Sequence, residues 1–317
     1  MTLARPRVLV MMATYNGEKY VAEQIESVLS QEGVDVTLRI SDDGSSDGTC
    51  SICEGFAERD SRVRFRRNPA NKGLAKNFMD MVWEDGADGF DWYAFSDQDD
   101  VWLPEKLTRA IEALEERAPE GPALYYSDVE NVGADLSGGT REYAAWASCA
   151  HSLLAVLTVN WASGCTMVFN PALRTWILSY EPSSYDRIHD GWLHLAAMVS
   201  GTVVADLGHS YIKRRISGEN QVGERDLEDT ESLASVSYRW KRIFRESNHV
   251  QTHVAAQLLE GFRDKMRPED EELVRMFAAM PHSAAVRVRI AKKLAVCPFP
   301  TKSMARGYAA KALMNRL

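Results

Sequence analysis

Short apolar runs alternate with amphipathic stretches over the first 120 residues of the chain. The runs at 8–12, 34–40, 63–66 and 92–95 have the lengths and residue types of buried strands. The stretches between them repeat apolar residues every three or four positions, which is the spacing of a helix with one buried face. This alternation predicts an α/β fold with a mainly parallel, doubly wound sheet, whose ligands bind at the carboxyl ends of the strands.

The same pattern divides the chain into two parts. Residues 1–223 carry the strand and helix signals, densely over 1–120 and more sparsely over 121–223. From residue 224 onward the pattern is helical. We therefore expect an α/β domain over 1–223, built from two halves, and a helical C-terminal extension over 224–317.

Acidic residues follow the second and the fourth predicted strands. Asp42, Asp43, Asp97 and Asp99 are all expected to project into one crevice, because the carboxyl ends of parallel strands meet at the same edge of a sheet. Closely packed carboxylates repel one another, and a cation between them removes that repulsion. Oxygen ligands favour Mg²⁺ or Mn²⁺. The alternative is an acidic first turn for a helix that begins at Pro104, where negative charge is favourable without a metal.

Composition and motifs argue against several classes of protein. A net charge of -8 argues against general nucleic-acid binding. The loop after the first strand contains neither GxGxxG nor GxxxxGK[ST], which argues against a dinucleotide enzyme or a P-loop ATPase. Five irregularly spaced cysteines predict no disulfide framework. Cys50 and Cys53 are expected to pack in a helix, and Cys165 to be a small buried side chain rather than a nucleophile.

The last 45 residues form a separate electrostatic region. After Glu272 every charged residue is basic, namely Arg275, Arg287, Arg289, Lys292, Lys293, Lys302, Arg306, Lys311 and Arg316. No segment reaches membrane-spanning length, so we expect a cytoplasmic protein. A basic stretch that also carries apolar residues is typical of a peripheral contact with the inner face of an anionic cell membrane. A solvated helical tail and a homodimer surface are the alternatives.

The motifs, taken in order, resemble the signature series of family 2 glycosyltransferases. They are Met12-Ala13-Thr14-Tyr15-Asn16-Gly17, Ser41-Asp42-Asp43-Gly44-Ser45-Ser46-Asp47-Gly48-Thr49, Asn71-Lys72-Gly73 and Ser96-Asp97-Gln98-Asp99-Asp100-Val101-Trp102. The form SDQDDVW resembles the rhamnosyltransferase-like branch of bacterial polysaccharide biosynthesis. The resemblance covers about residues 8–223.

This resemblance implies a fold and an activity. The fold is the nucleotide-diphospho-sugar transferase fold, also called the A-type glycosyltransferase fold. The activity is an inverting, metal-dependent transfer of a sugar, rhamnose in the similar branch, from a dTDP- or UDP-linked donor. The acceptor is a hydroxyl of a glycan or a lipid-linked molecule of the cell envelope.

The resemblance also implies roles for individual residues. Thr14 and Tyr15 would lie against the nucleotide, and Asp42 would accept a hydrogen bond from the imide N–H of the base. Asp97 would contact the ribose and the diphosphate. Asp99, two residues after Asp97, would hold the Mg²⁺ or Mn²⁺ ion that bridges the two phosphates, and Asp97 is expected to be a ligand of the same ion.

Further candidates come from the same motifs and from later segments. Asn16, Asp43 and Lys72 lie in the matching motifs and are expected to contribute to the nucleotide site. Asp190 would be the general base that removes the proton from the acceptor hydroxyl. The alternative role for Asp190 is a helix cap, since it lies where a helix is expected to begin.

Arg214 and Arg215 lie near the end of the region that resembles the family. They are expected to neutralise the diphosphate, because a guanidinium group matches phosphate geometry. Related chains have a histidine three residues after the first of these arginines, where this chain has Ser217, a poor metal ligand.

Two other functions stay open. A sugar-nucleotide pyrophosphorylase shares the nucleotide-binding sheet, but it normally has a glycine-rich loop with Arg and Lys after the first strand, unlike Ala13-Thr14-Tyr15-Asn16. A catalytically silent protein for glycan assembly or membrane scaffolding is suggested by Ser217 and by the basic tail.

Overall fold

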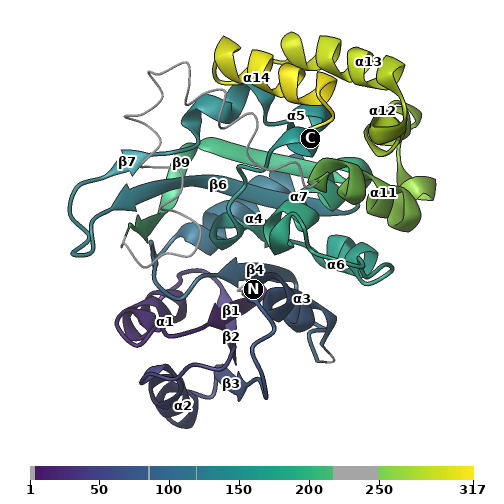
Figure 1. Ribbon diagram of the computed structural model, residues 1–317. Coiled ribbons are helices and arrows are strands. Elements are labelled where there is room, and N and C mark those ends of the chain that lie inside the picture. Colours follow the sequence, from purple (N-terminus) through teal and green to yellow (C-terminus); the bar gives the residue numbers. More distant parts are fainter. Residues whose placement is uncertain (1–3, 85, 119, 217–248) are drawn as a thin grey trace.

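The computed structural model describes residues 4–84, 86–118, 120–216 and 249–317 (Figure 1). Within these residues nine strands form one sheet in the order β3-β2-β1-β4-β8-β6-β9-β5, with β7 paired to β6. The strands are β1 (Arg7–Thr14), β2 (Asp35–Asp42), β3 (Val63–Arg67), β4 (Trp92–Ser96), β5 (Val101–Trp102), β6 (Ala123–Val132), β7 (Thr140–Arg141), β8 (Val168–Phe169) and β9 (Thr202–Arg215).

The sheet is parallel in its first half and mixed in its second. Strand β1 pairs in parallel with β2 and β4, and β2 pairs in parallel with β3. Strand β8 is antiparallel to both of its neighbours, β4 and β6, while β6 and β9 are again parallel. The predicted α/β class and mainly parallel sheet are therefore confirmed, and the antiparallel β8 is a feature that the apolar pattern did not reveal.

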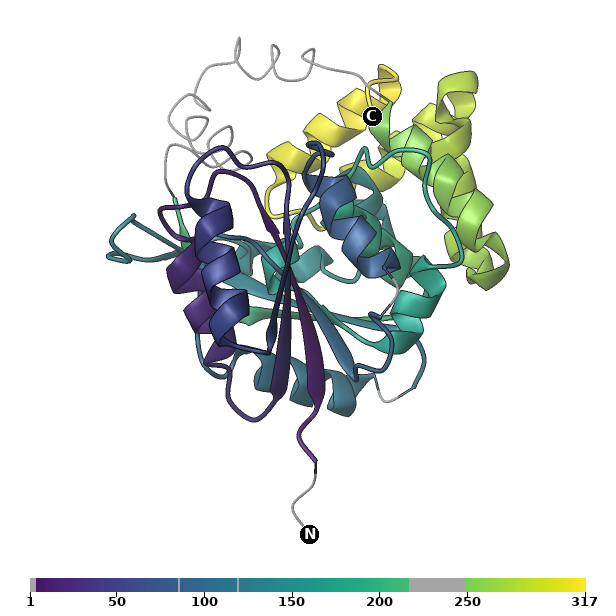
Figure 2. The same ribbon diagram turned by 90° about the horizontal axis from the view of Figure 1, so that it is seen from below.

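Helices cover both faces of the sheet. Figure 2 shows α1 and α2 on one side of the strands and α3 with the C-terminal helices on the other. The helices are α1 (Val21–Leu29), α2 (Thr49–Arg59), α3 (Leu74–Trp83), α4 (Lys106–Arg117), α5 (Leu153–Thr158), α6 (Pro171–Ile177), α7 (Ile188–Ser200), α11 (Val250–Phe262), α12 (Pro268–Ala279), α13 (Ala284–Ala295) and α14 (Lys302–Leu313).

Strand β1 shows why the predicted strands are apolar throughout. Val8, Val10 and Met12 point into the core that contains α1 and α4, whereas Leu9 and Met11 point into the core that contains α3 and α7. All five side chains are buried. A strand covered on both faces buries every side chain, so it has no polar side to alternate with.

The C-terminal helices pack against the α/β part of the molecule. Leu258 of α11, Phe277 of α12 and Leu294 of α13 belong to the same buried cluster as Leu9 of β1. The hydroxyl of Ser148 also donates a hydrogen bond of 2.7 Å to the backbone carbonyl just before α14, at Pro298. The last helices are thus part of the core rather than a detached tail.

Two of the sequence-based predictions concern residues that the structure does not describe. The expected domain boundary between residues 223 and 224, and Ser217 with its expected lack of metal-binding ability, lie outside them. Of the helices that are described, none combines the length and the apolar composition needed to cross a membrane.

Candidate active site

A cavity of about 1270 Å³ lies at the carboxyl ends of β1 and β4. Its walls also include the segment 158–164, the N-terminal turn of α7 and one face of α14. Thr14, Asp97, Asp190 and Arg214 all line this cavity although they are far apart in the chain. The first half of the molecule and the C-terminal helices therefore share one recess.

The loop after β1 is fixed by backbone contacts that leave one aromatic ring exposed. The backbone N–H of Tyr15 donates to Oε1 of Gln98 at 2.8 Å, and Nε2 of Gln98 donates to the carbonyl of Tyr15 at 3.0 Å. The side chain of Asn16 accepts a hydrogen bond from the backbone N–H of Ser46 at 2.9 Å. The Tyr15 ring is 40% exposed at the cavity wall, which suits stacking against a planar base.

Asp42 lies behind this wall rather than in it. Its carboxylate is fully buried and accepts hydrogen bonds from the hydroxyls of Thr14 and Ser45, the amides of Gly44 and Ser45, and the thiol of Cys50. Burial raises the pKa of Asp42, but the hydrogen bonds lower it by more, so the net shift is downward. These contacts argue against the expected direct contact between Asp42 and the base, because the carboxylate of Asp42 shapes the loop that bears the wall.

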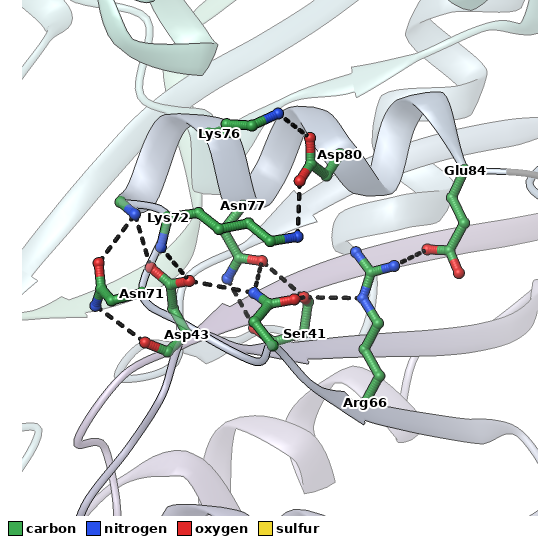
Figure 3. A network of polar contacts seen from close by, with 11 residues as sticks. Ser41, Asp43, Arg66, Asn71, Lys72, Lys76, Asn77, Asp80 and Glu84 are labelled. Carbon is green, nitrogen blue, oxygen red and sulfur yellow. Dashed lines mark hydrogen bonds and ion pairs between the residues drawn. The ribbon is translucent and has the colours of Figure 1, made fainter.

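Asp43 reaches the edge of the cavity, yet its carboxylate is also held by the protein (Figure 3). It accepts hydrogen bonds from the backbone amides of Lys72 and Gly73, each 2.9 Å long, and from Nδ2 of Asn68 at 3.2 Å. The ammonium group of Lys72 is paired with Asp80 of α3 at 2.8 Å. This ion pair argues against the expectation that Lys72 contacts the donor, because the ammonium group lies against α3.

Two residues of the loop after β4 and one from the segment before β8 bring three potential ligand atoms within 4.8 Å of one another. They belong to Asp97, Asp100 and Cys165. Asp100 is 1% exposed, and neither of its carboxylate oxygens has a hydrogen-bond partner among the described residues. A buried carboxylate without a partner is unfavourable unless a cation or a proton compensates it.

The electrostatics of this cluster favour a divalent cation. Burial raises the pKa of Asp97 to about 7, with a further contribution from the charge of Asp99, and burial also raises the pKa of Asp99 and of Asp100. A bound cation opposes all three shifts. Burial raises the pKa of the Cys165 thiol well above its ordinary value, so this group stays protonated and is a poor ligand for a hard ion. The carboxylates therefore fit Mg²⁺ or Mn²⁺, and the thiol does not.

Asp100 is the member of this cluster that sequence reasoning missed. Asp97 was expected to act with Asp99, whose charge does act on it, but Asp99 is outside the group of three. The signal for Asp100 was present, because it lies in the same SDQDDVW motif. What the motif did not reveal is which of the neighbouring carboxylates is left without a partner.

Arg214 and Arg215 of β9 have different surroundings. Arg214 lines the cavity, where it is held by Asn131 at 2.9 Å, by the Tyr143 hydroxyl at 3.2 Å and by an ion pair with Glu142. Its charge lowers the pKa of Asp97. This position stays compatible with a contact to a diphosphate.

Arg215 is enclosed in the protein. It is 2% exposed, donates a hydrogen bond of 2.9 Å to the backbone carbonyl of Asp99 and forms an ion pair with Glu23 of α1. Its guanidinium also lies 4.6 Å from the centre of the Tyr20 ring. These contacts argue against the expected contact of Arg215 with the diphosphate, because this residue connects the acidic loop to α1 and β9.

Asp190 lies in the first turn of α7, where its carboxylate meets three donors. They are Nδ2 of Asn160 at 3.1 Å and the backbone amides of Gly164 at 3.1 Å and Gly191 at 2.5 Å. Arg187 occupies the N-cap position of α7, three residues before Asp190, so Asp190 is not the cap. Burial raises the pKa of Asp190 to about 7. A carboxylate with such a pKa can accept a proton near neutral pH.

The first half of the chain is similar in sequence to a known protein family. Residues 9–157 match the sequence model of one family, Glycosyl transferase family 2. The family 2 segment contains the loop with Tyr15 and the acidic loop with Asp97 and Asp100, whereas Asp190 and Arg214 lie beyond it.

Curated relatives match over similar segments. The dTDP-rhamnosyl transferase RfbG of Shigella flexneri is 40% identical over 105 residues, which cover 32% of this chain and 36% of that protein. The putative glycosyltransferase EpsE of Bacillus subtilis is 38% identical over 111 residues, covering 35% and 39%. The chain thus spans less than half the length of these two relatives.

Solved structures extend the likeness to the whole fold. Staphylococcus aureus TarS residues 1–349, crystallised with UDP-GlcNAc, aligns with a TM-score of 0.56 at 17% identity, covering 98% of this chain and 91% of that one. The mannosyltransferase PcManGT of Pyrobaculum calidifontis, solved with GDP-Man and Mn²⁺, aligns at 0.55 and 15% identity, covering 99% and 87%. The predicted A-type glycosyltransferase fold is therefore confirmed.

Proposed function

We propose that this chain is an inverting, metal-dependent glycosyltransferase that moves a sugar from a nucleoside diphosphate donor to a hydroxyl group of a glycan or a lipid-linked acceptor. The observation that carries the proposal is the cavity, which is lined both by the acidic cluster of Asp97 and Asp100 and by Asp190. The family 2 segment supports the same reaction class.

The donor would bind at the end of the cavity formed by β1 and β4. The exposed ring of Tyr15 provides a stacking surface for the base, and Arg214 provides positive charge for the diphosphate. Asp97 and Asp100, together with the neighbouring Asp99, would hold Mg²⁺ or Mn²⁺. Such an ion would neutralise the negative charge that develops on the leaving diphosphate.

Asp190 would act on the acceptor. Its carboxylate takes the proton from the acceptor hydroxyl, while the hydroxyl oxygen forms a bond to the anomeric carbon and the bond from that carbon to the diphosphate breaks. A single displacement of this kind inverts the anomeric configuration. The raised pKa of Asp190, about 7, keeps the carboxylate basic enough for the task.

The sugar is proposed from one relative. The dTDP-rhamnosyl transferase of Shigella flexneri shares 40% identity over 105 residues, which supports dTDP-rhamnose as the first donor to test and a UDP-linked sugar as the second. The acceptor is proposed to be a glycan or a lipid-linked molecule of the cell envelope. This proposal is supported by a glucosyltransferase of Campylobacter jejuni, which matches this chain over 142 residues and whose name includes an undecaprenol-linked substrate.

A further proposal concerns a cytoplasmic location with a peripheral membrane contact. Three of the exposed large apolar side chains, Val288, Val296 and Leu313, lie on or beside α13 and α14. Exposed Lys292 and Lys293 stand near Val296 in the chain, and such a mixture suits an anionic lipid surface.

The membrane proposal is tested by sedimentation with vesicles of phosphatidylglycerol or of phosphatidylcholine. We expect binding to the anionic vesicles alone, with a loss of binding when Val296→Ser is combined with Lys292→Gln and Lys293→Gln. Equal sedimentation of the variant contradicts the proposal. A mass of two chains in ultracentrifugation without vesicles, lost in the same variant, would instead assign the surface to a homodimer.

The enzymatic proposal is tested by donor binding and by transfer. A thermal-shift panel of nucleotide sugars with Mn²⁺ is expected to give the largest stabilisation for the true donor, because a ligand that binds the folded state stabilises it according to its affinity. Asp190→Asn is expected to retain donor binding and to lose transfer. A fully active Asp190→Asn variant would refute the role of Asp190, and absence of donor binding would favour a silent scaffold.

A further inference from the structure

Asp190 is held by a chain of two polar side chains that leads away from the cavity. Nδ2 of Asn160 donates a hydrogen bond of 3.1 Å to Oδ1 of Asp190, and Oδ1 of Asn160 lies 3.3 Å from Nδ1 of His194. Asn160 lines the cavity, whereas His194 is fully buried one turn along α7 from Asp190. The contact connects the segment before β8 to the helix that bears Asp190.

The contacts fix the orientation of the Asn160 amide. Its nitrogen lies near two acceptors, the Asp190 carboxylate and the backbone carbonyl of Ala162 at 3.2 Å. A rotated amide would turn its oxygen toward both of these oxygens and lose both hydrogen bonds. The amide oxygen of Asn160 therefore faces His194.

The orientation of Asn160 in turn fixes the tautomer of His194. Because Oδ1 of Asn160 can only accept, Nδ1 of His194 must carry the hydrogen. The imidazole ring lies among aromatic side chains, with its centre 5.0 Å from that of Tyr126 and 5.9 Å from that of Trp161. Its other nitrogen, Nε2, has no hydrogen-bond partner within the described ranges 4–84, 86–118, 120–216 and 249–317. This ring is therefore a neutral donor at Nδ1.

The two oxygens of Asp190 are not equivalent. Oδ1 accepts from Asn160 and from the amide of Gly191, whereas the described residues give Oδ2 a single donor, the amide of Gly164. A side chain at position 164 would place its Cβ 2.6 Å from Nε2 of His189 and 3.3 Å from Cβ of Asp190, so only glycine fits there. Oδ2 thus retains more capacity to accept a proton, and Oδ1 is the anchored atom.

We infer that Asn160 and His194 are positioning residues for the general base: His194 orients Asn160, and Asn160 holds Oδ1 of Asp190 so that Oδ2 faces the acceptor hydroxyl. This inference rests on the proposed role of Asp190 as base. Loss of either residue removes the constraint on the carboxylate but leaves Asp190 itself in place. Rates are sensitive to such constraints, because a small displacement of a reacting group slows a reaction strongly.

The test compares four variants in hydrolysis of dTDP-rhamnose with Mn²⁺, where water replaces the acceptor, and in calorimetric binding of dTDP. We expect Asn160→Ala to lower kcat by about 10- to 100-fold while the Kd for dTDP changes less than about twofold. His194→Asn keeps a donor near the position of Nδ1 and should stay within about threefold of the parent. His194→Leu keeps the volume but has no donor and should fall about tenfold or more.

The order of the two His194 variants separates positioning from packing. If His194 only fills space, leucine in an aromatic slot should serve as well as asparagine or better, and that result overturns the inference. The double variant Asn160→Ala with His194→Leu should be no slower than Asn160→Ala alone, because both changes break one chain of contacts. If His194→Leu does not fold, the kcat of Asn160→Ala alone tests the inference. Asn160 is only half-buried, so its replacement by alanine is expected to leave the fold intact.

Asn170→Ala is the matched structural control. Asn170 also makes defined hydrogen bonds, accepting from the backbone amides of Leu173 and Ala123, but it caps α6 away from the cavity lining. We expect it to lose stability without a fall in kcat. If Asp190→Asn is inactive while Asn160→Ala and His194→Leu keep the full rate, the positioning inference fails and the proposed function stands. If Asp190→Asn is itself fully active, the proposed function fails first.

Discussion

The loops after β2 and after β4 carry the same sequence signal, adjacent carboxylates at the end of a buried strand, but the fold treats them in opposite ways. Asp42, the last residue of β2, is surrounded by donors, and its pKa is lowered. Asp100, after β4, is equally buried, has no partner among the described residues, and its pKa is raised. A satisfied carboxylate builds structure, whereas an unsatisfied one indicates a ligand that completes it.

The largest expected effect is on the rate of transfer. Asp97→Asn should lower transfer by about a thousandfold, because the variant loses a negative ligand for the cation that neutralises the leaving diphosphate. The melting temperature without metal should not fall, since the change removes repulsion from Asp99 and Asp100. Initial rates at saturating Mn²⁺ and a metal-free melting curve measure the two quantities. A rate within tenfold of the parent would assign the cation to other ligands.

The next effect is on stability. Asp42→Ala should lower the free energy of unfolding by about 3 kcal/mol, because it leaves buried donors of Gly44, Ser45 and Thr14 without an acceptor. Urea unfolding at neutral pH measures it. Asp100→Asn is the matched comparison, and we expect it to cost less than about 1 kcal/mol or to stabilise the metal-free protein. Equal losses in the two variants would remove the distinction between the loops.

A change of about tenfold in kcat is expected for each pH unit below about 7. Burial raises the pKa of Asp190 to about 7, and only the deprotonated carboxylate can act as a base. The value of kcat should therefore fall as pH decreases through about 7, by about tenfold for each further pH unit. The profile is measured at saturating Mn²⁺, so that the cation keeps Asp97 and its neighbours deprotonated. A flat profile between about pH 5.5 and 8 argues against Asp190 as the base.

The smallest effect is expected at Lys72. Its ammonium group is paired with Asp80, so Lys72→Met should change the affinity for dTDP by less than about twofold. Arg214→Met, at a cation that lines the cavity, should weaken the affinity about tenfold. Isothermal titration calorimetry measures both. The reverse order would restore the sequence-based expectation for Lys72.

The fold could be predicted largely because buried parallel strands are apolar throughout. The apolar runs 8–12 and 92–95 predicted two strands in this way, and they lie within β1 and β4. The antiparallel β8 has only two residues, and its pairing with β4 and β6 depends on contacts between distant segments. The packing of α11 to α14 on the α/β part depends on such contacts as well, which a local pattern does not contain.

The site could be predicted as a location more easily than as a set of contacts. Four carboxylates, of Asp42, Asp43, Asp97 and Asp99, were expected in one crevice, and all but that of Asp42 belong to residues that line one cavity. The partner of Arg215 is Glu23, which is 192 positions away in the chain, and no spacing rule connects them. No role of its own could be assigned to Asn160 from the sequence, because its importance comes only from its contacts with Asp190 and His194.

The most direct test of the account is the position of a bound cation. Crystals grown with Mn²⁺ and a nucleoside diphosphate should show an anomalous manganese peak between the carboxylates of Asp97 and Asp100, with the diphosphate on the side of Arg214. Asp42 should keep its hydrogen bonds to Thr14 and Ser45 in the same crystal. A manganese peak at Asp42 or Asp43, or a diphosphate bound away from Asp97, would contradict the account.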